Sequence, residues 1–226
     1  GEDWQHLRNA FGIWAPETLY NGRSGHIMNP WTERRIKLWC EHKFQTWWGP
    51  AAAGKTKDAA IIALLDYFSA PQDTCTVVCS TTRPMLEKRI WAEIMNFFIP
   101  YKRHLPAELQ KAKHSIVAVP EIDPKAGIHG VAIMQGTVEE ALGNLIGLHM
   151  KYVRVIIDEM QSTREAAVES CTNLSKGCLD FKFLGMGNPA NRFDPLVRYG
   201  THVDGFDKCS PSLPGWPTRR GYCAYF

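Results

Sequence analysis

One stretch constrains the fold of this chain more than any other: residues 49–56 read Gly-Pro-Ala-Ala-Ala-Gly-Lys-Thr. The spacing is Gly, four residues, then Gly-Lys-Thr, which matches the P-loop pattern at every specified position. An aromatic run typical of a strand, Phe44–Trp48, precedes the loop, and a helical pattern, Lys57–Phe68, follows it. A loop placed in this way directs backbone N–H groups and the positive end of a helix dipole at a phosphate. The sequence therefore predicts a strand, loop and helix that bind a nucleoside triphosphate.

The residue types in the loop predict separate roles in binding ATP and Mg²⁺, which are the expected cofactors. The glycines let the backbone approach the phosphates without a Cβ in the way. Lys55 is predicted to reach the β- and γ-phosphates, and the Thr56 hydroxyl is predicted to ligate Mg²⁺. The predicted ATP-binding residues are Gly49, Pro50, Ala51, Ala52, Ala53, Gly54, Lys55 and Thr56.

A second stretch, Tyr152–Glu159, predicts the catalytic half of the same site. Its Val and Ile residues are typical of a buried parallel strand, and the strand ends in Asp158 and Glu159. Ligands gather outside the carboxyl ends of parallel strands, so both carboxylates are expected beside the P-loop. We predict that Asp158 holds Mg²⁺ through its water shell. Glu159 is predicted to orient and polarise the water that attacks the γ-phosphate, while Lys55 stabilises the phosphate charge.

The other periodic segments predict an α/β fold. A strand at Cys75–Cys79 and a helix at Pro84–Phe98 follow the P-loop helix, and a further helix is expected at Thr163–Leu174. Alternating strands and helices favour right-handed crossovers and a mainly parallel central sheet flanked by helices. Ser115–Val119 and Gly130–Gln135 are expected to form a hairpin at the edge of this sheet.

Three further residues are candidates for nucleotide contacts outside the loop. Trp31 and Arg35 lie on a predicted helix upstream of the P-loop, and either could stack on an adenine ring; a tryptophan in this position also commonly belongs to the core. A strand at Asp180–Leu184 leads into the turn Gly185–Pro189, which places Asn188 beside the nucleotide. Asn188 could sense the γ-phosphate there, although Asn-Pro is also a routine turn.

The composition permits a nucleic-acid partner without requiring one. The chain is 45% hydrophobic and 22% charged, and its formal charge of +3 is only mildly basic. A basic stretch, Ile99–Ser115, could follow a nucleic-acid backbone or could be a solvated surface helix. No stretch approaches the ~20 apolar residues of a membrane span. The seven cysteines contain no Cys-x-x-Cys pair, which favours reduced thiols over a disulfide framework or a zinc site.

The 226 residues are long enough for one sizeable core, which predicts a single domain with flanking segments. Residues 1–29 are predicted as an N-terminal extension and residues 30–199 as the P-loop ATPase domain. Residues 200–226 are rich in Gly and Pro, which predicts a linker that leaves the core. Short helices are also expected at Trp4–Phe11 and Thr137–Leu142.

The two motifs and a third, Phe183–Pro189, together resemble the ATPase domain of the large terminase subunit of tailed bacteriophages, over roughly Pro30–Pro195. The third motif is similar to the family's coupling motif, whereas the first two are shared with helicases and other ATPases. The resemblance implies an additional-strand, RecA-like P-loop NTPase fold and a motor that hydrolyses ATP to drive double-stranded DNA into a procapsid. It implies a homo-oligomeric ring on a portal, with the portal protein and a small terminase subunit as partners and no membrane. It also implies action in the host cell cytoplasm rather than a place in the mature virion.

Three features depart from the family's pattern. Family members often carry an Arg-Gly pair before the acidic strand, where this chain reads Leu145-Ile146-Gly147; any arginine finger would come from elsewhere, and the candidates are Arg83, Arg103 and Arg154. The glutamine often found in the upstream adenine motif is absent. The family's C-terminal nuclease has no matching set of carboxylates here, so residues 200–226 are expected to lead towards such a domain and no nuclease activity is expected from this fragment.

Two other functions remain open because they use the same loop. A helicase or another DNA-dependent ATPase would share both motifs. A nucleotide kinase would also need a lid with several arginines and a small phosphate acceptor. A scaffold with a degenerate site is disfavoured because Lys55, Thr56, Asp158 and Glu159 are all present.

Overall fold

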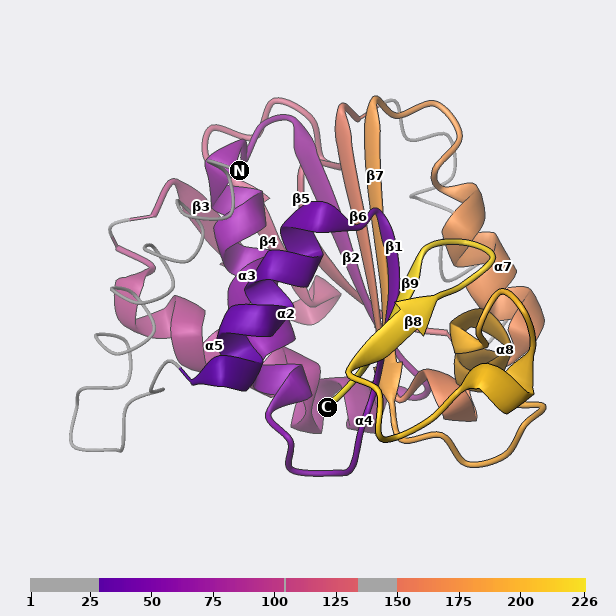
Figure 1. Cartoon of the computed structure of the whole chain (residues 1–226). Coiled ribbons are helices and arrows are strands. Elements are labelled where there is room, and N and C mark those ends of the chain that lie inside the picture. The colour runs from indigo at the N-terminus through magenta and orange to yellow at the C-terminus, as the bar shows by residue number, and fades with distance from the viewer. Residues whose placement is uncertain (1–28, 104, 134–149) are drawn as a thin grey trace.

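The computed structural model describes residues 29–103, 105–133 and 150–226. The helices predicted at Trp4–Phe11 and Thr137–Leu142 lie outside these ranges, as do Leu145-Ile146-Gly147 and nearly all of the predicted extension at residues 1–29. Within them, a nine-stranded sheet separates two layers of helices (Figure 1). The predicted α/β fold with a mainly parallel sheet is confirmed.

The sheet has a parallel centre and antiparallel edges, in the order β3-β4-β5-β2-β6-β7-β1-β9-β8. Strands β5, β2, β6, β7, β1 and β9 run parallel to one another, whereas β3, β4 and β8 are antiparallel to their neighbours. The strands are β1 Phe44–Trp48, β2 Thr74–Ser80, β3 Ala107–Gln110, β4 Ser115–Ala118, β5 Gly127–Ala132, β6 Tyr152–Asp158, β7 Asp180–Gly187, β8 Gly215–Pro217 and β9 Tyr222–Tyr225.

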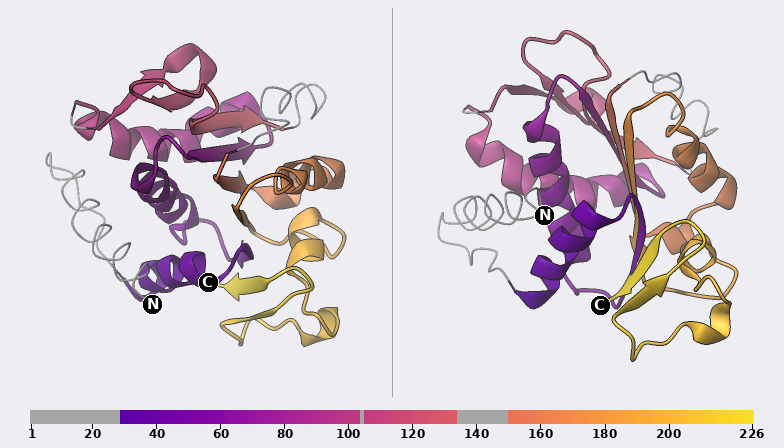
Figure 2. Two further views of the ribbon diagram at one scale, coloured as in Figure 1. Left: turned by 90° about the horizontal axis from the view of Figure 1, so that it is seen from above. Right: turned by 45° about the horizontal axis from the view of Figure 1, so that its top comes forward.

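Helices cover both faces of this sheet (Figure 2). Helices α2, α3 and α5 pack on one face, and α7 and α8 pack on the other. Side-chain caps start several of them: Asn29 accepts from the backbone of Trp31 and Thr32, and Asp194 accepts from Val197. The helices are α2 Pro30–Glu41, α3 Lys55–Ser69, α4 Arg83–Lys88, α5 Ile90–Phe98, α7 Glu165–Asn173 and α8 Pro195–Gly200, with 3-10 turns at Ile99–Tyr101, Lys111–Lys113, Met160–Ser162 and Phe206–Lys208.

Alternation along the central strands fills two cores. In β6, Val155 and Ile157 belong to the core beneath α7 and α8, whereas Ile156 belongs to the core beneath α2, α3 and α5. Helix α3 lies in the middle of its layer, and its residues Ala59–Leu64 are at most 1% exposed. This burial fixes α3, and with it the loop that leads into α3, on the sheet.

Two predicted segments differ in the structure. The helix predicted at Pro84–Phe98 is broken at Arg89, whose backbone has φ −114° and ψ −102°, and the break separates α4 from α5. The basic stretch Ile99–Ser115 is not a surface helix, because it contains β3 and short 3-10 turns. Strand β4 pairs with β5 as the predicted edge hairpin, but β5 begins at Gly127, three residues before the predicted start at Gly130. Strand β3 pairs with β4 and adds one more strand outside the hairpin.

Residues 200–226 add two strands to the sheet, which differs from the predicted linker that leaves the core. Strand β9 pairs in parallel with β1, and β8 pairs with β9. Trp216 is 2% exposed and Cys223 is 0% exposed, so the segment contributes to the core. The Gly and Pro residues that suggested a linker fall in turns and on the short edge strand, where proline is tolerated.

The structure describes all seven cysteines, and each is a free thiol. Of the helices in the described ranges, none combines the length and the apolar character that a membrane-crossing helix needs.

Candidate nucleotide-binding site

The residues between β1 and α3 form an exposed turn at the N-terminus of α3, which begins at Lys55. Ala52 has φ 63° and Gly54 has φ 76°, so both lie in the left-handed region, which is easy for glycine and costly for alanine. Such strain is typical of ligand-binding turns. The predicted strand, loop and helix are therefore present, with an anion-binding helix N-terminus at their junction.

Lys55 lies within the loop rather than in solvent. Its residue is 8% exposed, and Nζ donates to the carbonyl oxygens of Gly49 at 2.8 Å and Pro50 at 2.7 Å. Burial lowers the pKa of Lys55 to about 8, and the nearby charge of Arg35 acts in the same direction. The two carbonyls hold the ammonium at the loop.

The loop and the acidic strand meet. Thr56 Oγ1 donates to Asp158 Oδ1 at 3.4 Å, although 102 residues separate the two in the sequence. Asp158 is the last residue of β6 and is 2% exposed. Burial raises the pKa of Asp158 to about 6, against the opposing charge of Arg89. The structure thus brings Lys55, Thr56 and Asp158 to one place, as the sequence predicted; their roles stay predictions.

Buried oxygen atoms at the ends of β2 and β6 fit a Mg²⁺ ion. Asp158 Oδ2 and Ser80 Oγ are buried, and neither has a hydrogen-bond partner among the described residues. Cys79 pairs with Ile157, so Ser80, the next residue, lies beside Asp158 at the end of β2. Oxygen ligands from one carboxylate and hydroxyls, completed by phosphate and water, are what Mg²⁺ prefers. Ser80 is a residue that the sequence analysis missed.

Glu159 occupies a strained position directly after β6. Its φ of 55° and ψ of 43° lie in the left-handed region, which a non-glycine residue adopts at a cost. Its carboxylate contacts the guanidinium of Arg89 and the side-chain amide of Gln161. Strain of this kind persists where the surrounding contacts over-determine the backbone, and it clusters at functional sites.

Arg89 is the second residue that the sequence analysis missed. It lies at the break between α4 and α5, its Nε is 3.2 Å from Asp158 Oδ2, and its guanidinium also contacts Glu159. The Nε contact lacks the alignment of a hydrogen bond, so it is electrostatic. The surrounding sequence reads as an unbroken helix, so no signal in it separates Arg89 from the exposed charges nearby.

Arg35 supports the loop from within the protein. It is 1% exposed, its Nη1 is 2.6 Å from Asp58 Oδ2, and its Nη2 donates to the Ala53 carbonyl at 2.7 Å. Its guanidinium lies 4.3 Å from the centre of the Phe226 ring. This geometry does not fit the predicted stacking of Arg35 on an adenine ring. Trp31, which is 52% exposed, stays a candidate for that contact.

Replacing Arg35 with methionine is expected to destabilise the fold by about 3–5 kcal/mol, because it removes the guanidinium from a buried carboxylate. Arg34→Met is the matched control: its guanidinium bonds the carbonyls of Tyr225 and Pro214, and the expected loss is about 1.5 kcal/mol. Chemical denaturation of both variants measures the difference. Equal losses of unfolding free energy in the two variants would show that the Arg35–Asp58 pair contributes no more to stability than the contacts of Arg34.

The motif Phe183–Pro189, which resembles the coupling motif of the terminases, packs against the residues that follow Glu159. A Cβ on Gly185 would lie 2.0 Å from Met160 Sδ, and one on Gly187 would lie 1.9 Å from Gln161 Oε1. Because Gln161 contacts Glu159, β7 is linked to the acidic pair through one side chain.

Asn188 follows directly after β7 and is exposed. The carbonyl of Gly187 accepts from the backbone N–H of Gly49 at 3.3 Å, so Asn188 lies beside the start of the P-loop. Its sensor role stays a prediction.

The three arginines that are candidates for an arginine finger differ in how accessible their side chains are. Arg154 is 5% exposed and lies 3.0 Å from both Asp66 and Asp180, so it is part of the core and is not available to a neighbouring subunit. Arg83 and Arg103 are exposed, and Arg83 pairs with Glu87 at 3.0 Å.

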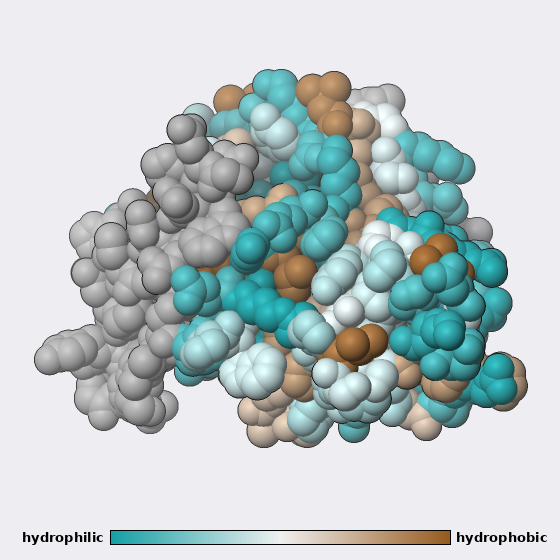
Figure 3. Space-filling model, in the orientation of Figure 1, coloured by the Kyte–Doolittle hydropathy of each residue, from teal (hydrophilic) through white to brown (hydrophobic). Residues whose placement is uncertain are grey.

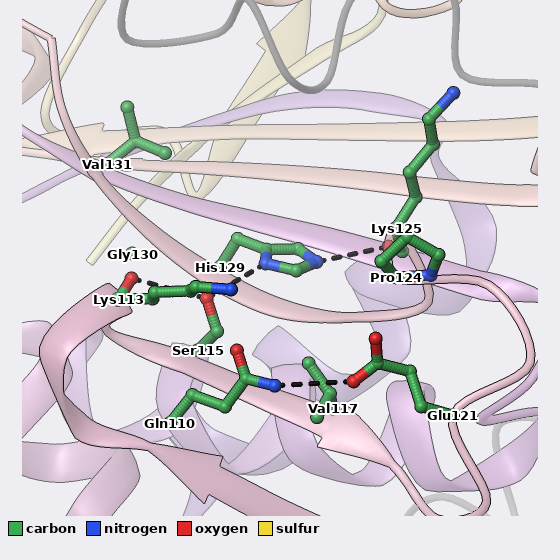
Figure 4. A pocket seen from close by; sticks show the side chains of 10 residues that line it. All are labelled: Gln110, Lys113, Ser115, Val117, Glu121, Pro124, Lys125, His129, Gly130 and Val131. Carbon is green, nitrogen blue, oxygen red and sulfur yellow. Dashed lines mark hydrogen bonds between the residues drawn. The ribbon is translucent and has the colours of Figure 1, made fainter.

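A separate cavity of about 580 Å³ lies at the β3–β4–β5 edge of the sheet (Figure 4). The His129 ring is fixed in its wall, with Nδ1 3.1 Å from Ser115 Oγ and Nε2 3.1 Å from the Lys125 carbonyl. Burial lowers the pKa of His129, which favours the neutral ring. None of its lining residues belongs to the P-loop or to β6: Gln110, Lys113, Ser115, Val117, Glu121, Pro124, Lys125, His129, Gly130 and Val131.

Known structures share this fold, although no protein-family model and no curated protein matches the sequence. The large terminase of bacteriophage HK97 matches with a TM-score of 0.66 and 13% identity, over 87% of this chain and 40% of that one. The N-terminal domain of the DNA packaging ATPase from bacteriophage phi29 matches with a TM-score of 0.57 and 10% identity, over 88% of this chain and 95% of that one. The large terminase of a thermophilic bacteriophage, solved in complex with ADP, matches with a TM-score of 0.51 and 12% identity, over 97% of this chain and 44% of that one. These matches confirm the predicted resemblance in fold, and the chain spans 40% of the length of the HK97 protein.

Proposed function

We propose that this chain is the ATP-hydrolysing domain of a DNA-packaging motor of the large terminase type. The observation that carries the proposal is the meeting of the P-loop with the acidic end of β6, where Thr56 Oγ1 lies 3.4 Å from Asp158 Oδ1. The fold shared with the large terminases and the phi29 packaging ATPase supports it. The ADP bound to the large terminase of the thermophilic bacteriophage supports an adenine nucleotide as the ligand.

In this proposal, different residues of the chain have separate roles in ATP hydrolysis. Lys55 and the N–H groups of the loop bind the β- and γ-phosphates and neutralise their charge. Glu159 orients a water and accepts its proton as the water oxygen bonds to the γ-phosphorus and the bond to the leaving ADP oxygen breaks. Arg89 and Gln161 position the Glu159 carboxylate. Thr56 and Asp158, with Ser80 beside Asp158, would hold Mg²⁺, which would supply further charge neutralisation.

The motor as a whole is part of the same proposal. Double-stranded DNA is the substrate that the motor moves, and a ring of copies on a portal, together with a small terminase subunit, forms the assembly. The action would take place in the host cell cytoplasm at the procapsid. The names of the matching proteins, two large terminases and one DNA packaging ATPase, support this setting.

Release of phosphate from ATP tests the enzymatic core of the proposal. We expect the chain to bind ATP and to release phosphate when Mg²⁺ is present, and chelation of the metal is expected to stop release. Release that requires a nucleoside monophosphate acceptor would favour a nucleotide kinase instead. A chain that binds neither ATP nor ADP in calorimetry would overturn the proposal.

A further inference from the structure

Three arginines line a cavity of about 430 Å³ on the side of the sheet that carries α7 and α8. Arg198 lies on α8, and Arg219 and Arg220 lie in the turn between β8 and β9. The cavity also contains His202 and a single carboxylate, Glu165. We call this site the arginine pocket. Its lining carries more positive than negative charge, which favours an anionic ligand.

Two of the three arginines of the pocket, Arg198 and Arg220, are held in place before any ligand binds. The turn is closed by a hydrogen bond of 2.8 Å from the Thr218 N–H to the Gly221 carbonyl, and Thr218 Oγ1 accepts from the Arg220 N–H at 3.3 Å. The Arg220 guanidinium lies 4.5 Å from the centre of the Tyr199 ring, and Arg198 pairs with Glu165. Stacking uses a face of a guanidinium, whereas its N–H donors lie in the plane. Pre-organisation of this kind lowers the entropy lost on binding.

Exposed aromatic rings and another arginine lie next to the pocket. Phe206 follows Gly205, which lines the pocket, and the Arg192 guanidinium lies 5.7 Å from the Phe206 ring and 5.6 Å from the Phe193 ring. Phe193 is 77% exposed and Phe206 is 45% exposed. Figure 3 shows hydrophilic residues gathered over α8 and the adjoining C-terminal segment. Arg192 therefore adds a further positive charge beside the pocket, next to these rings.

We propose that the arginine pocket binds the phosphodiester backbone of double-stranded DNA. The choice of duplex DNA rests on the proposed function, which the pocket deepens by giving the motor a place to hold its substrate. Guanidinium groups form paired hydrogen bonds with phosphate oxygens, and two adjacent arginines on one turn can reach successive phosphates. Contacts of this type position a protein on DNA without reading its sequence, as a motor that moves along any sequence requires.

Two charge-matched double variants test the pocket. Arg219→Ser with Arg220→Ser removes two positive charges from the pocket, and Lys37→Ser with Lys43→Ser removes two exposed positive charges, one from α2 and one from the residue before β1. Binding of a short labelled duplex is measured by fluorescence anisotropy over a range of salt concentrations. Each phosphate contact contributes about 0.9 to the slope of log K against log salt. We expect the arginine variant to reduce the slope by about 2 and the affinity by at least about tenfold at low salt. The lysine variant is expected to bind like the parent.

The possible results distinguish DNA binding at the arginine pocket from attraction by net charge and from binding of an acidic protein. Equal losses in both double variants would mean that net charge alone attracts DNA, and DNA binding that the arginine variant retains would also overturn the proposal. A parent chain that binds polyglutamate but not duplex DNA would overturn it in favour of an acidic protein partner. Because Arg220 packs on Tyr199, the single variant Arg219→Ser serves if the double variant does not fold, and its expected change in slope is about 1. Phosphate release without DNA is measured in parallel; its absence from the parent would count against the proposed function and not against the pocket.

Discussion

Glu159→Gln is expected to lower the rate of ATP hydrolysis by about 10²–10⁴-fold while ATP binding is retained. Glutamine keeps the size of the side chain, but it cannot accept the proton of the attacking water. ATP affinity is expected to change little, because in our proposal the phosphates are held by the loop and Lys55. Phosphate release at saturating ATP measures the rate, and calorimetry measures the binding.

The loss should come from chemistry rather than from unfolding. The Glu159 side chain is 19% exposed and that of Arg89 is 37% exposed, and pairs between partly exposed groups contribute little to stability. Glu169→Gln, an exposed change of the same kind on α7, is the control for loss of one carboxylate. Unchanged hydrolysis in Glu159→Gln would reject the assigned role, and equal losses in both variants would point to a general effect of charge.

The main parts of this site could be predicted because each is a short local pattern and a general rule of topology joins them. The loop pattern fixed Lys55 and Thr56 at the start of a helix, and the run of β-branched residues before Asp158 identified a buried strand. Carboxyl ends of parallel strands lie at one edge of a sheet, so the two patterns had to meet if they shared a sheet. The 3.4 Å contact of Thr56 with Asp158 is the result of that rule.

Residues whose position depends on tertiary packing could not be predicted in the same way. Arg89 reaches the acidic pair only because the chain leaves helical geometry there, and its sequence neighbours favour a continuous helix. Ser80 could have been found, because it is a polar residue next to the end of a predicted central strand. Arg35 pairs with Asp58 on another helix, and a guanidinium can either stack on a base or pair with a buried carboxylate. Spacing alone does not distinguish these uses.

The C-terminal segment shows that composition alone does not distinguish a linker from short edge strands. Gly and Pro are frequent both in linkers and in short edge strands with tight turns, so residues 200–226 fitted either interpretation. The structure places β9 against β1, and the backbone N–H of Phe226 donates to the Trp48 carbonyl at 2.9 Å. The end of the described chain therefore lies directly beside the start of the P-loop. A Cβ on Gly49 would lie 2.6 Å from the Phe226 carbonyl oxygen, which explains why this first loop position is glycine.

Lys55→Ala is expected to weaken ATP binding and to lower the rate of hydrolysis by about 10²–10³-fold, the typical effect of removing one group that stabilises charge in the transition state. The ammonium lies within the loop, held by the carbonyls of Gly49 and Pro50, and no other lysine or arginine donates to those two oxygens among the described residues. Lys57→Ala, two residues further along α3, removes the same charge from the same helix and is expected to keep both properties. Calorimetry with ATP and phosphate release at saturating ATP compare the two variants. If Lys55→Ala binds ATP as tightly as the parent, the loop is not the nucleotide site, because a side chain placed at the phosphates must contribute to their affinity.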